Sequence, residues 1–545
     1  MSNNRLTALL VFILTITFYT VTLLPSLAWG DGAKLQSEVI SGESFVLAEM
    51  TRDRFSSDPF LFAKVGVAAW DHPLYIMLGH VLVRTLRFVD ALWLVNFISA
   101  VFGAASVALV FLLCYRFTDS TLASCFAALS LAVSHTFWWH SSTPEVYTLF
   151  VFLFLVSFYL FDHYERRGKY LSLVFSGLFL GLAASNHILA FLALPALALY
   201  YLSSTNIRVF QRVEARVLVY PSLGFIIGFL IYLIQFARMT RSFPPAEIMG
   251  TVVGMTFLSR LEITNLILLG KSAITFLFLL MVQFNPVGLI LGAYGIRQIF
   301  RSENLFLRKI AALLAVFTSF GVLYQVSDQF AFFMTAYVFW AIMMGIGAAY
   351  FSSVLSGKMR SVSFTMLAIT VLATPFFYNS LPSLAERYRV NDTSLGVPQI
   401  GTGIRNGLAY YLNPNKRGDF NAHEFGRQTI SNVAPGSVVI AEWYTDTDEY
   451  FILRYFAKVE KLRSDVTVVG WPTYDPFTFD PRLALNLIER SFPDRPIYLA
   501  SLSDRFYASS KLIQMYCIVP ENNLYRLYQK EASDLRCLKN DSVTE

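Results

Sequence analysis

The first acidic residue of the chain stands directly after a long apolar run. Asp31 lies between two glycines in the stretch LPSLAWGDGAKLQSEV, residues 24–39. A carboxylate at such a place can cap a short helix, or it can act as a general base that takes a proton from a reacting hydroxyl. Because Asp31 follows the predicted apolar helix and does not start it, capping is the weaker explanation and a chemical role the stronger.

Other residues capable of acid–base or hydrogen-bonding chemistry gather in short segments between apolar runs. Ionisable groups at membrane depth are costly and usually face a bundle interior or a wet cavity. If these segments share one face of the molecule, the pattern predicts an active site open to that face. The candidates are Asp71 and His72 in AAWDHPLY, His135, His140 and Glu145 in SHTFWWHSSTPEVY, Asn186 and His187 in AASNH, and Asp328 in YQVSDQF.

Simpler explanations exist for some of these residues. A histidine at a membrane interface can be a hydrated cap. Glu145 follows Thr143-Pro144 in the predicted first turn of a helix, where proline and an acid are both favoured. Trp138 and Trp139 are interpreted as belt aromatics of a membrane protein and not as stacking platforms, although a sugar ring could use either.

The composition defines the elements that must position these residues. Of the 545 residues, 55% are hydrophobic and only 15% are charged, and the mean hydropathy is +0.52. Soluble domains carry about 25% charged residues. The apolar residues also occur in runs of about 20, the length that spans a bilayer as a helix. The chain is therefore predicted to be a polytopic α-helical membrane protein, and its net charge of +6 does not indicate a nucleic-acid partner.

Eleven spans are predicted from these runs. A further apolar stretch, 73–88, carries Arg84 and Arg87 and is predicted to be an interfacial helix. The first run is interpreted as an uncleaved anchor, although Ser26-Leu27-Ala28 resembles a signal-peptidase site. The predicted spans are 7–29, 89–116, 120–139, 145–163, 170–186, 188–204, 217–237, 273–297, 309–326, 329–354 and 361–380.

The orientation follows from lysines and arginines in the short loops. Alternate loops are basic, while the turns HSSTPE, SNH and VSDQ carry no lysine or arginine. The N-terminus is therefore predicted to be cytoplasmic and the C-terminus extracytoplasmic, with two long outer loops at 30–72 and 238–272. The basic residues are Arg166, Arg167 and Lys169, then Arg208, Arg212 and Arg216, then Arg297, Arg301, Arg308 and Lys309, and finally Lys358 and Arg360.

The segment 381–545 has a different composition from the membrane part, 1–380. GSVVIAEW, SDVTVVGW and RPIYLASL are typical of buried strands, and helical patterns lie between them. This alternation predicts a small extracytoplasmic α/β domain with a parallel sheet. Cys517 and Cys537 fall in this domain, where a disulfide is permitted, while Cys114 and Cys125 fall near the predicted cytoplasmic ends of two spans.

Several sequence blocks resemble a known family. An acid just after the first span, in a long outer loop, resembles the GT-C superfamily of lipid-phosphate-dependent glycosyltransferases. More closely, the N-terminal half is similar to multispanning O-mannosyltransferase-like proteins long catalogued as a domain of unknown function. That family's Gly-Asp-Ser-Gly-Glu-Leu, His-Pro-Pro-Gly-Tyr-Pro-Leu-Tyr, Phe-Trp…Ala-Glu-Val-Tyr-Thr-Leu and Ser-Asn-His blocks correspond in order to GDGAKL, DHPLY, FWWHSSTPEVYTL and SNH.

Two positions depart from the family pattern. The glutamate three residues after the aspartate is Lys34 here, and the Pro-Pro-Gly-Tyr stretch is shortened to Asp71-His72-Pro73. A second acid is missing at its usual place, and Asp71 is a candidate to replace it. The sugar or donor can therefore differ from the mannosyl transfer seen among relatives.

The resemblance implies a glycosyltransferase, with inversion as the expected stereochemistry. It would move mannose or a similar hexose from a polyprenyl-phosphate carrier to a hydroxyl of a protein or glycan acceptor on the extracytoplasmic face. Asp31 would be the catalytic base, assisted by Asp71, with His72 orienting the acceptor. His140, Glu145, Asn186, His187 and Asp328 are the other candidate substrate-binding residues. Candidates for the donor phosphate are Arg238, Arg241, Arg260 and Lys271, which could instead anchor lipid headgroups.

No resident cofactor is predicted. The spacing of cysteines and histidines does not resemble a zinc site, and a divalent metal remains open because only some members of the superfamily use one. The main alternative function is a transporter or flippase of a lipid-linked or anionic substrate, which usually shows inverted repeats and midplane sites. A non-catalytic scaffold for the outer domain is the third possibility.

Overall fold

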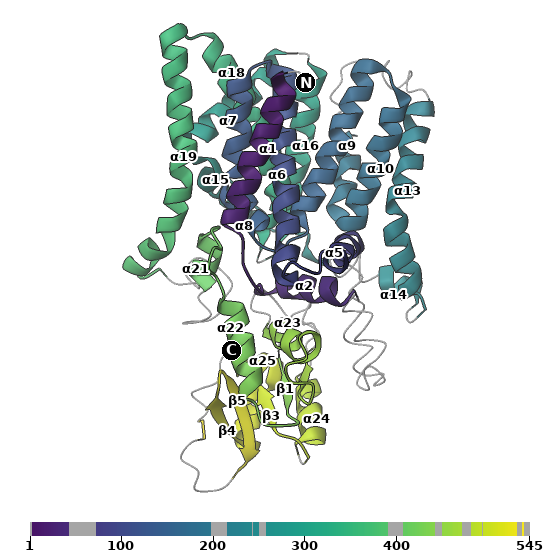
Figure 1. The fold of residues 1–545 in the computed structure, drawn as a ribbon, viewed down its shortest axis with the longest axis vertical. Helices are drawn as coiled ribbons and strands as arrows, with labels where there is room; N and C mark the ends of the chain where they lie inside the picture. The colour runs from purple at the N-terminus through teal and green to yellow at the C-terminus, as the bar shows by residue number, and fades with distance from the viewer. Residues whose placement is uncertain are drawn as a thin grey trace.

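The structure is a computed structural model of the full chain. It describes residues 3–42, 72–197, 215–241, 244–249, 258–302, 304–326, 328–390, 407–441, 449–470, 481–492, 494–530 and 537–538. A helical bundle forms one end of the molecule, and a small domain with a sheet forms the other (Figure 1). The N-terminus lies at the end of the bundle that is far from this C-terminal domain.

Long apolar helices make up the bundle. Within the described residues, eight are long and apolar enough to cross a membrane, or nine if the bent pair α7–α8 is one span. The polytopic helical prediction is confirmed, whereas the count of eleven stays a prediction, since α10 and 188–197 are shorter apolar helices. The long helices are α1 (Asn3–Val21), α6 (Ala91–Thr118), α9 (Tyr147–Arg167), α13 (Ala215–Met239), α15 (Leu266–Arg301), α16 (Leu305–Leu323), α18 (Met334–Ser353) and α19 (Gly357–Arg387).

Shorter elements lie mainly at the end of the bundle that faces the C-terminal domain. Helices α2 and α5 lie across this end (Figure 1), so the helix predicted at 73–88 is present as α5, and its position at the membrane interface stays a prediction. The shorter elements are α2 (Asp31–Ser41), α5 (Pro73–Thr85), α7 (Thr121–Ala132), α8 (His135–Ser142), α10 (Tyr170–Asn186), η2 (Ile188–Leu192), α14 (Pro245–Met249), η4 (Leu258–Arg260) and α17 (Gln329–Phe332).

Two predicted spans have different shapes in the structure. The first helix ends at Val21 and not at residue 29, and a non-helical segment continues to Gly30, which has a positive φ of 60°. Pro25 in this segment cannot continue the helix. The span predicted at 120–139 is broken into α7 and α8, which meet at an angle of 61°.

Close backbone contact joins α10 to α13. A Cβ atom added at Gly181 would lie 2.2 Å from the carbonyl oxygen of Phe225, and one added at Gly228 would lie 2.2 Å from that of Leu178. Gly177-x-x-x-Gly181 and Gly224-x-x-x-Gly228 thus act as the small-residue motifs that let membrane helices approach closely. Ser185 on α10 also donates a hydrogen bond to the Gly228 carbonyl at 2.9 Å.

A buried group of charges joins α6, α9 and α16. The Asp162 carboxylate accepts from Arg116 at 2.9 Å, from Arg166 at 3.1 Å and from Lys309 at 3.2 Å, and Lys309 also contacts Glu165. Loops that the charge pattern places on one side of the membrane therefore meet in one cluster. Which side is cytoplasmic stays a prediction.

The C-terminal domain contains a mixed sheet in the order β2-β1-β3-β5-β4. The three strands predicted from the sequence are parallel neighbours, as expected. The sheet is nevertheless mixed and not parallel throughout, because β4 and β5, which were not predicted, form an antiparallel hairpin that adds to β3. The strands are β1 (Val438–Ile440), β2 (Thr467–Val469), β3 (Ile497–Leu499), β4 (Tyr516–Glu521) and β5 (Leu524–Gln529).

Helices cover both faces of this sheet. Alternate residues of β1 divide between two cores, with Val438 and Ile440 in one and Val439 in the other. The core that includes Val439 also contains residues of α22 and α23, and it continues into the bundle through Trp29 and Trp139. The helical elements of this domain and its connection are α21 (Gly407–Leu412), α22 (Asn421–Asn432), α23 (Glu449–Arg454), η6 (Tyr455–Val459), α24 (Arg482–Ser491), α25 (Asp504–Tyr507) and α26 (Ser509–Met515).

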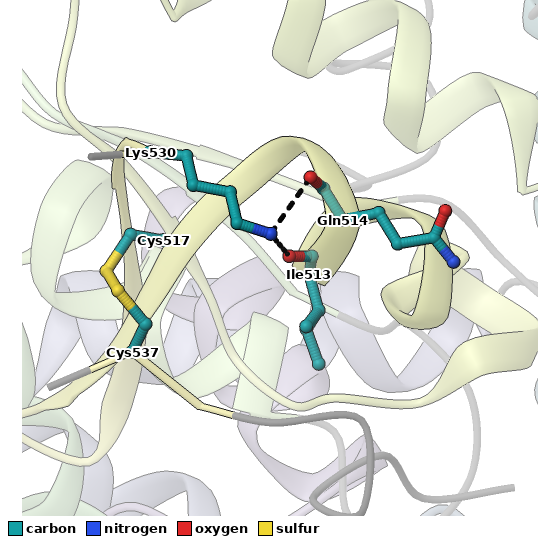
Figure 2. The surroundings of a disulfide bond; sticks show 5 residues. All are labelled: Ile513, Gln514, Cys517, Lys530 and Cys537. Atoms are coloured by element: carbon teal, nitrogen blue, oxygen red, sulfur yellow. Dashed lines mark hydrogen bonds between the residues drawn. A yellow bond between two sulfur atoms is a disulfide. The ribbon is translucent and has the colours of Figure 1, made fainter. Parts of the chain in front are cut away.

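A disulfide closes the last part of the domain. Cys517 on β4 is bonded to Cys537 (Figure 2). Nearby, the Lys530 ammonium donates to the carbonyl oxygens of Ile513 at 2.9 Å and Gln514 at 3.1 Å, so the end of β5 is tied to α26. The cysteines predicted to lie in this domain are therefore paired.

The glycine contacts between α10 and α13 lead to a stability prediction. Gly181→Ala should destabilise the purified protein by roughly 1–3 kcal/mol, because the new methyl group overlaps the Phe225 carbonyl. Gly270→Ala on α15 is the control, since nothing lies within 4 Å of a Cβ added there. Thermal unfolding in detergent measures the difference, and equal midpoints for the two variants would contradict the packing.

Candidate active site

Asp31 is held in place by the non-helical segment that precedes it. This segment leaves the end of α1 and crosses the bundle to the first residue of α2. In apolar surroundings its backbone groups need partners inside the protein. The Leu24 amide donates to the Ser142 carbonyl at 2.9 Å, which fixes the start of the segment against the end of α8.

Two buried amide side chains form hydrogen bonds with the backbone groups in the middle of the segment. Gln36 accepts from the Ala28 amide at 2.9 Å and donates to the Ser26 carbonyl at 3.0 Å. Asn96 on α6 donates to the Leu24 carbonyl at 2.8 Å and to that of Ser26 at 3.0 Å. The two side chains also bond to each other at 2.8 Å. This network sets where α2 begins and therefore where Asp31 lies, and the sequence analysis did not identify either residue.

A pocket of about 720 Å³, part of it open to solvent, lies at the N-terminus of α2. It combines polar side chains from four parts of the bundle with three aromatic side chains, Trp139, Tyr410 and Tyr411, which we call the aromatic wall. Of the predicted site residues it contains Asp31, His72, His140, Glu145 and Asp328. The full lining is Trp29, Gly30, Asp31, Gly32, Lys34, Leu35, His72, Trp139, His140, Glu145, Val146, Tyr147, Asp328, Phe330, Ala331, Tyr410 and Tyr411.

The Asp31 side chain is exposed to the interior of this pocket. Protein nevertheless surrounds it, and this burial raises the pKa of its carboxyl, while the charge of Lys34 lowers it. Lys34 is one turn along α2, is almost fully buried, and pairs with Glu38 at 3.5 Å. Asp31 is thus a carboxylate whose affinity for a proton is increased by its surroundings, which suits a general base.

The hydrogen bonds of two histidines define their neutral forms. His140 Nδ1 lies 2.8 Å from the Thr136 carbonyl, and His72 Nδ1 lies 2.6 Å from that of Asn186. A carbonyl can only accept, so Nδ1 carries a hydrogen in each ring, and in a neutral ring Nε2 is then the acceptor. Since His140 lines the pocket, its neutral form can accept a hydrogen bond from a ligand hydroxyl, and His72 lines the pocket beside it.

Asn186 and His187 lie behind the pocket and are not part of its described lining. Asn186 donates to the Val146 carbonyl at 2.8 Å, and its own carbonyl orients His72. The His187 ring stacks on His72 with centroids 5.4 Å apart. The structure therefore brings both residues to the site as supports of His72 and Val146, and their predicted contact with substrate stays a prediction.

The aromatic wall comes from two distant parts of the chain. Trp139 on α8 stacks on Tyr411 of α21 with centroids 5.9 Å apart and an interplanar angle of 11°. Trp139 also donates from Nε1 to the Tyr410 carbonyl at 3.1 Å, and His135 Nε2 lies 2.8 Å from the Tyr411 carbonyl. The sequence analysis missed Tyr410 and Tyr411, because no pattern links residues 410–411 to α8.

The basic residues predicted to bind phosphate lie away from this lining. Arg238, Arg241 and Lys271 are exposed, and Arg260 is partly buried. Lys34 is the one lysine or arginine among the described residues of the pocket wall. A role for the four predicted residues at the donor phosphate stays a prediction.

Asp71, the second predicted catalytic acid, lies outside the described residues, so its part in the site stays a prediction. Within the described part of the chain, no group of three or more histidine, cysteine, aspartate or glutamate residues is placed to hold a metal ion.

Comparison with known proteins extends this description. Residues 71–211, which are 141 of the 545 positions, match the family model described as the Protein O-mannosyl-transferase TMEM260 N-terminal domain. No curated protein sequence matches the chain. The family match contains His72, His140, Glu145, Asn186 and His187, and it agrees with the resemblance noted in the sequence.

Solved structures match over nearly the whole chain. ArnT from Cupriavidus metallidurans bound to undecaprenyl phosphate is 13% identical, with a TM-score of 0.56 over 96% of this chain and 98% of that one. The chain has a GT-C-like fold. The apo form of the same ArnT gives a TM-score of 0.56 at 12% identity, over 95% of this chain and 97% of ArnT. The apo Archaeoglobus fulgidus oligosaccharyltransferase gives 0.51 at 11% identity, over 96% and 75% respectively.

These matches confirm the predicted family resemblance and the predicted fold class. At such low identity the solved structures establish the fold alone. Together with the O-mannosyl-transferase domain match, the fold supports an enzyme of the glycosyltransferase kind.

Proposed function

We propose that this protein is an integral membrane glycosyltransferase that moves mannose or a similar hexose from a polyprenyl-phosphate carrier to a hydroxyl of a protein or glycan. The observation that carries the proposal is the Asp31 carboxylate, which is exposed within a partly open pocket of a GT-C-like fold. In ArnT, which has a similar fold, undecaprenyl phosphate is bound. This likeness supports a lipid phosphate as the donor.

Asp31 is the proposed catalytic base. It takes the proton from the acceptor hydroxyl as that oxygen attacks the anomeric carbon and the bond from that carbon to the phosphate oxygen breaks. The electron pair of the broken bond leaves with the polyprenyl phosphate. His140 accepts a hydrogen bond from a sugar or acceptor hydroxyl through Nε2, His72 orients the acceptor, and the aromatic wall excludes water.

The proposed reaction takes place on the extracytoplasmic face. Helix α2, which carries Asp31, contacts α23 and η6 of the C-terminal domain, so the pocket and this domain share one side of the bundle (Figure 1). The Cys517–Cys537 disulfide in that domain is typical of an oxidising compartment. Nucleotide sugars are made in the cytoplasm, whereas a lipid phosphate can present its head group at the other face.

The transporter alternative would place the substrate site near mid-depth between inverted repeats. Here the pocket is lined by the first turns of α2, by α8 and by α21, at the end of the bundle that meets the C-terminal domain. This position favours transfer to an acceptor outside the membrane.

The proposed function is tested with purified protein in liposomes. Polyprenyl-phosphate mannose, polyprenyl-phosphate glucose and a nucleotide sugar are offered separately with a mixture of acceptor peptides and glycans. Transfer from a lipid-linked sugar is expected. Transfer from the nucleotide sugar without a lipid carrier, or uptake of a lipid-linked sugar with no transfer, would overturn the proposal.

Asp31→Asn should abolish transfer while the protein still inserts and folds. The amide keeps the shape of the side chain but cannot take a proton, and a general base typically contributes about 10²–10⁴-fold to rate. The measurement is the initial rate with the preferred donor, at equal amounts of monodisperse protein. Activity within a few-fold of the unchanged protein would remove Asp31 from the role of base.

The two ring nitrogens of His140 can be tested separately. His140→Asn keeps a donor near the position of Nδ1 and loses the acceptor at Nε2, whereas His140→Gln places an amide oxygen near Nε2. We expect His140→Asn to lower kcat/KM about tenfold, the effect of one lost hydrogen bond of about 1.4 kcal/mol, and His140→Gln to retain most activity. The same loss in both variants would contradict acceptance through Nε2.

The pH dependence of transfer should reflect the environment of Asp31. The base works when ionised, so the rate should fall as the pH drops through a pKa that is higher than that of an ordinary aspartate. The double variant Lys34→Met with Glu38→Gln removes the charge that lowers this pKa. The fall of the rate at low pH, which we call the acidic limb of the pH profile, should therefore occur at higher pH in this variant.

Glu38→Gln alone is the control for this pH experiment. It keeps the Lys34 charge and removes its neutralising partner, so the acidic limb should stay or move to lower pH. Rates are measured from pH 4 to pH 8 at saturating donor. A double variant with an unchanged limb would show that Lys34 does not tune the base.

A further inference from the structure

Lys416 is a buried lysine directly behind the aromatic wall. It is 2% exposed, and its ammonium donates to the carbonyl oxygen of Tyr410. The same ammonium lies 4.0 Å from the centre of the Tyr410 ring and 5.5 Å from that of Trp139. The Lys416 ammonium therefore contacts both parts of the aromatic wall: Trp139, which comes from α8 of the bundle, and Tyr410, which comes from α21.

The segment that carries Lys416 is bonded to the bundle at this residue and again three residues later. The Lys416 amide donates to the Thr22 carbonyl at 2.9 Å, just beyond the end of α1. Ser26 donates to the Asp419 carbonyl at 3.3 Å. Residues 410–419, which we call the docking segment, thus rest on the same non-helical segment that leads to Asp31.

Burying a lysine is unfavourable unless its charge finds partners. Burial lowers the pKa of the Lys416 ammonium to about 7, and the charge of Asp419 opposes this shift. The partners here are a carbonyl oxygen and two ring faces, and cations over the faces of tryptophan and tyrosine are favourable. The same contacts that make this burial possible also fix Tyr410 relative to Trp139.

We propose that Lys416 is a positioning residue that holds Tyr410 and Tyr411 against Trp139 in the aromatic wall. It thereby determines the affinity of the pocket for the sugar of the donor. The inference rests on the proposed function, because it takes the pocket as the sugar site. Lys416 does not line the pocket, so it acts through the aromatic residues and does not touch the reacting atoms.

The test is Lys416→Met, which keeps the length of the side chain and removes both the charge and the donor. The KM for the lipid-linked sugar should rise about tenfold while kcat changes less than threefold, because Asp31 and the histidines keep their own supports. Lys416→Arg keeps a cation and a donor and should restore most of the affinity. The matched control is Arg417→Met, which removes the charge of the adjacent, exposed side chain and should leave both constants unchanged.

A second measurement does not depend on activity. Hydrogen exchange followed by mass spectrometry should show faster exchange of the amides of residues 410–419 in Lys416→Met, with α22 unchanged. If the unmodified protein transfers no sugar from any lipid carrier, the proposed function fails, and the exchange result still decides whether Lys416 holds the wall.

Two outcomes would overturn the inference. One is a KM for the donor within twofold of the unchanged protein in Lys416→Met. The other is unchanged exchange across the docking segment in that variant. Should Lys416→Met not fold, Lys416→Gln, which keeps a donor for the Tyr410 carbonyl but carries no charge, is measured in its place with the same criteria.

Discussion

The site depends on satisfying the backbone of one non-helical segment inside a membrane protein. Between Leu24 and Ala28 the backbone bonds to other parts of the protein and not in a helical pattern, and apolar surroundings cannot replace these bonds. Gln36 and Asn96 supply the missing partners and are themselves bonded to each other. Each unsatisfied buried group would cost about 1–3 kcal/mol. The position of Asp31, the first residue after this segment, is therefore a consequence of two buried amides on α2 and α6.

The same segment also receives the C-terminal part of the chain. Thr22 and Ser26 bond to residues 416 and 419, and one continuous apolar core runs from Trp29 and Trp139 to the C-terminal sheet at Val439. The pocket is thus completed only when both parts are together. The C-terminal domain is for this reason a component of the site and more than a separate module attached after the last helix.

The sequence was sufficient for the helical membrane part and for the group of polar residues that reaches the site, but not for the ends and breaks of the individual helices. Long apolar runs predict helices because a bilayer leaves few other structures possible, and Asp31, His72, His140, Glu145 and Asp328 were found because polar groups at membrane depth are rare. Gln36, Asn96, Tyr410 and Lys416 could not be found in this way. Their importance depends on contacts between distant positions, such as Asn96 with Leu24 and Lys416 with Trp139, and no local pattern records such pairs. The break between α7 and α8 was missed for a different reason, because 120–139 was interpreted as one span although Ser134 and His135 interrupt its apolar residues at the break.

The environment of Asp31 also explains how one carboxylate can serve as a base in a largely apolar site. Burial favours its protonated form, which would make it a stronger proton acceptor but leave less of it ionised at neutral pH. Lys34, one turn later on α2, and the positive end of that helix both favour the ionised form. Glu38 in turn neutralises part of the Lys34 charge at 3.5 Å. Because Lys34 and Glu38 follow at one-turn intervals on the same helix, α2 carries the base together with the charges that adjust it, and any change in where α2 begins moves all three relative to the pocket.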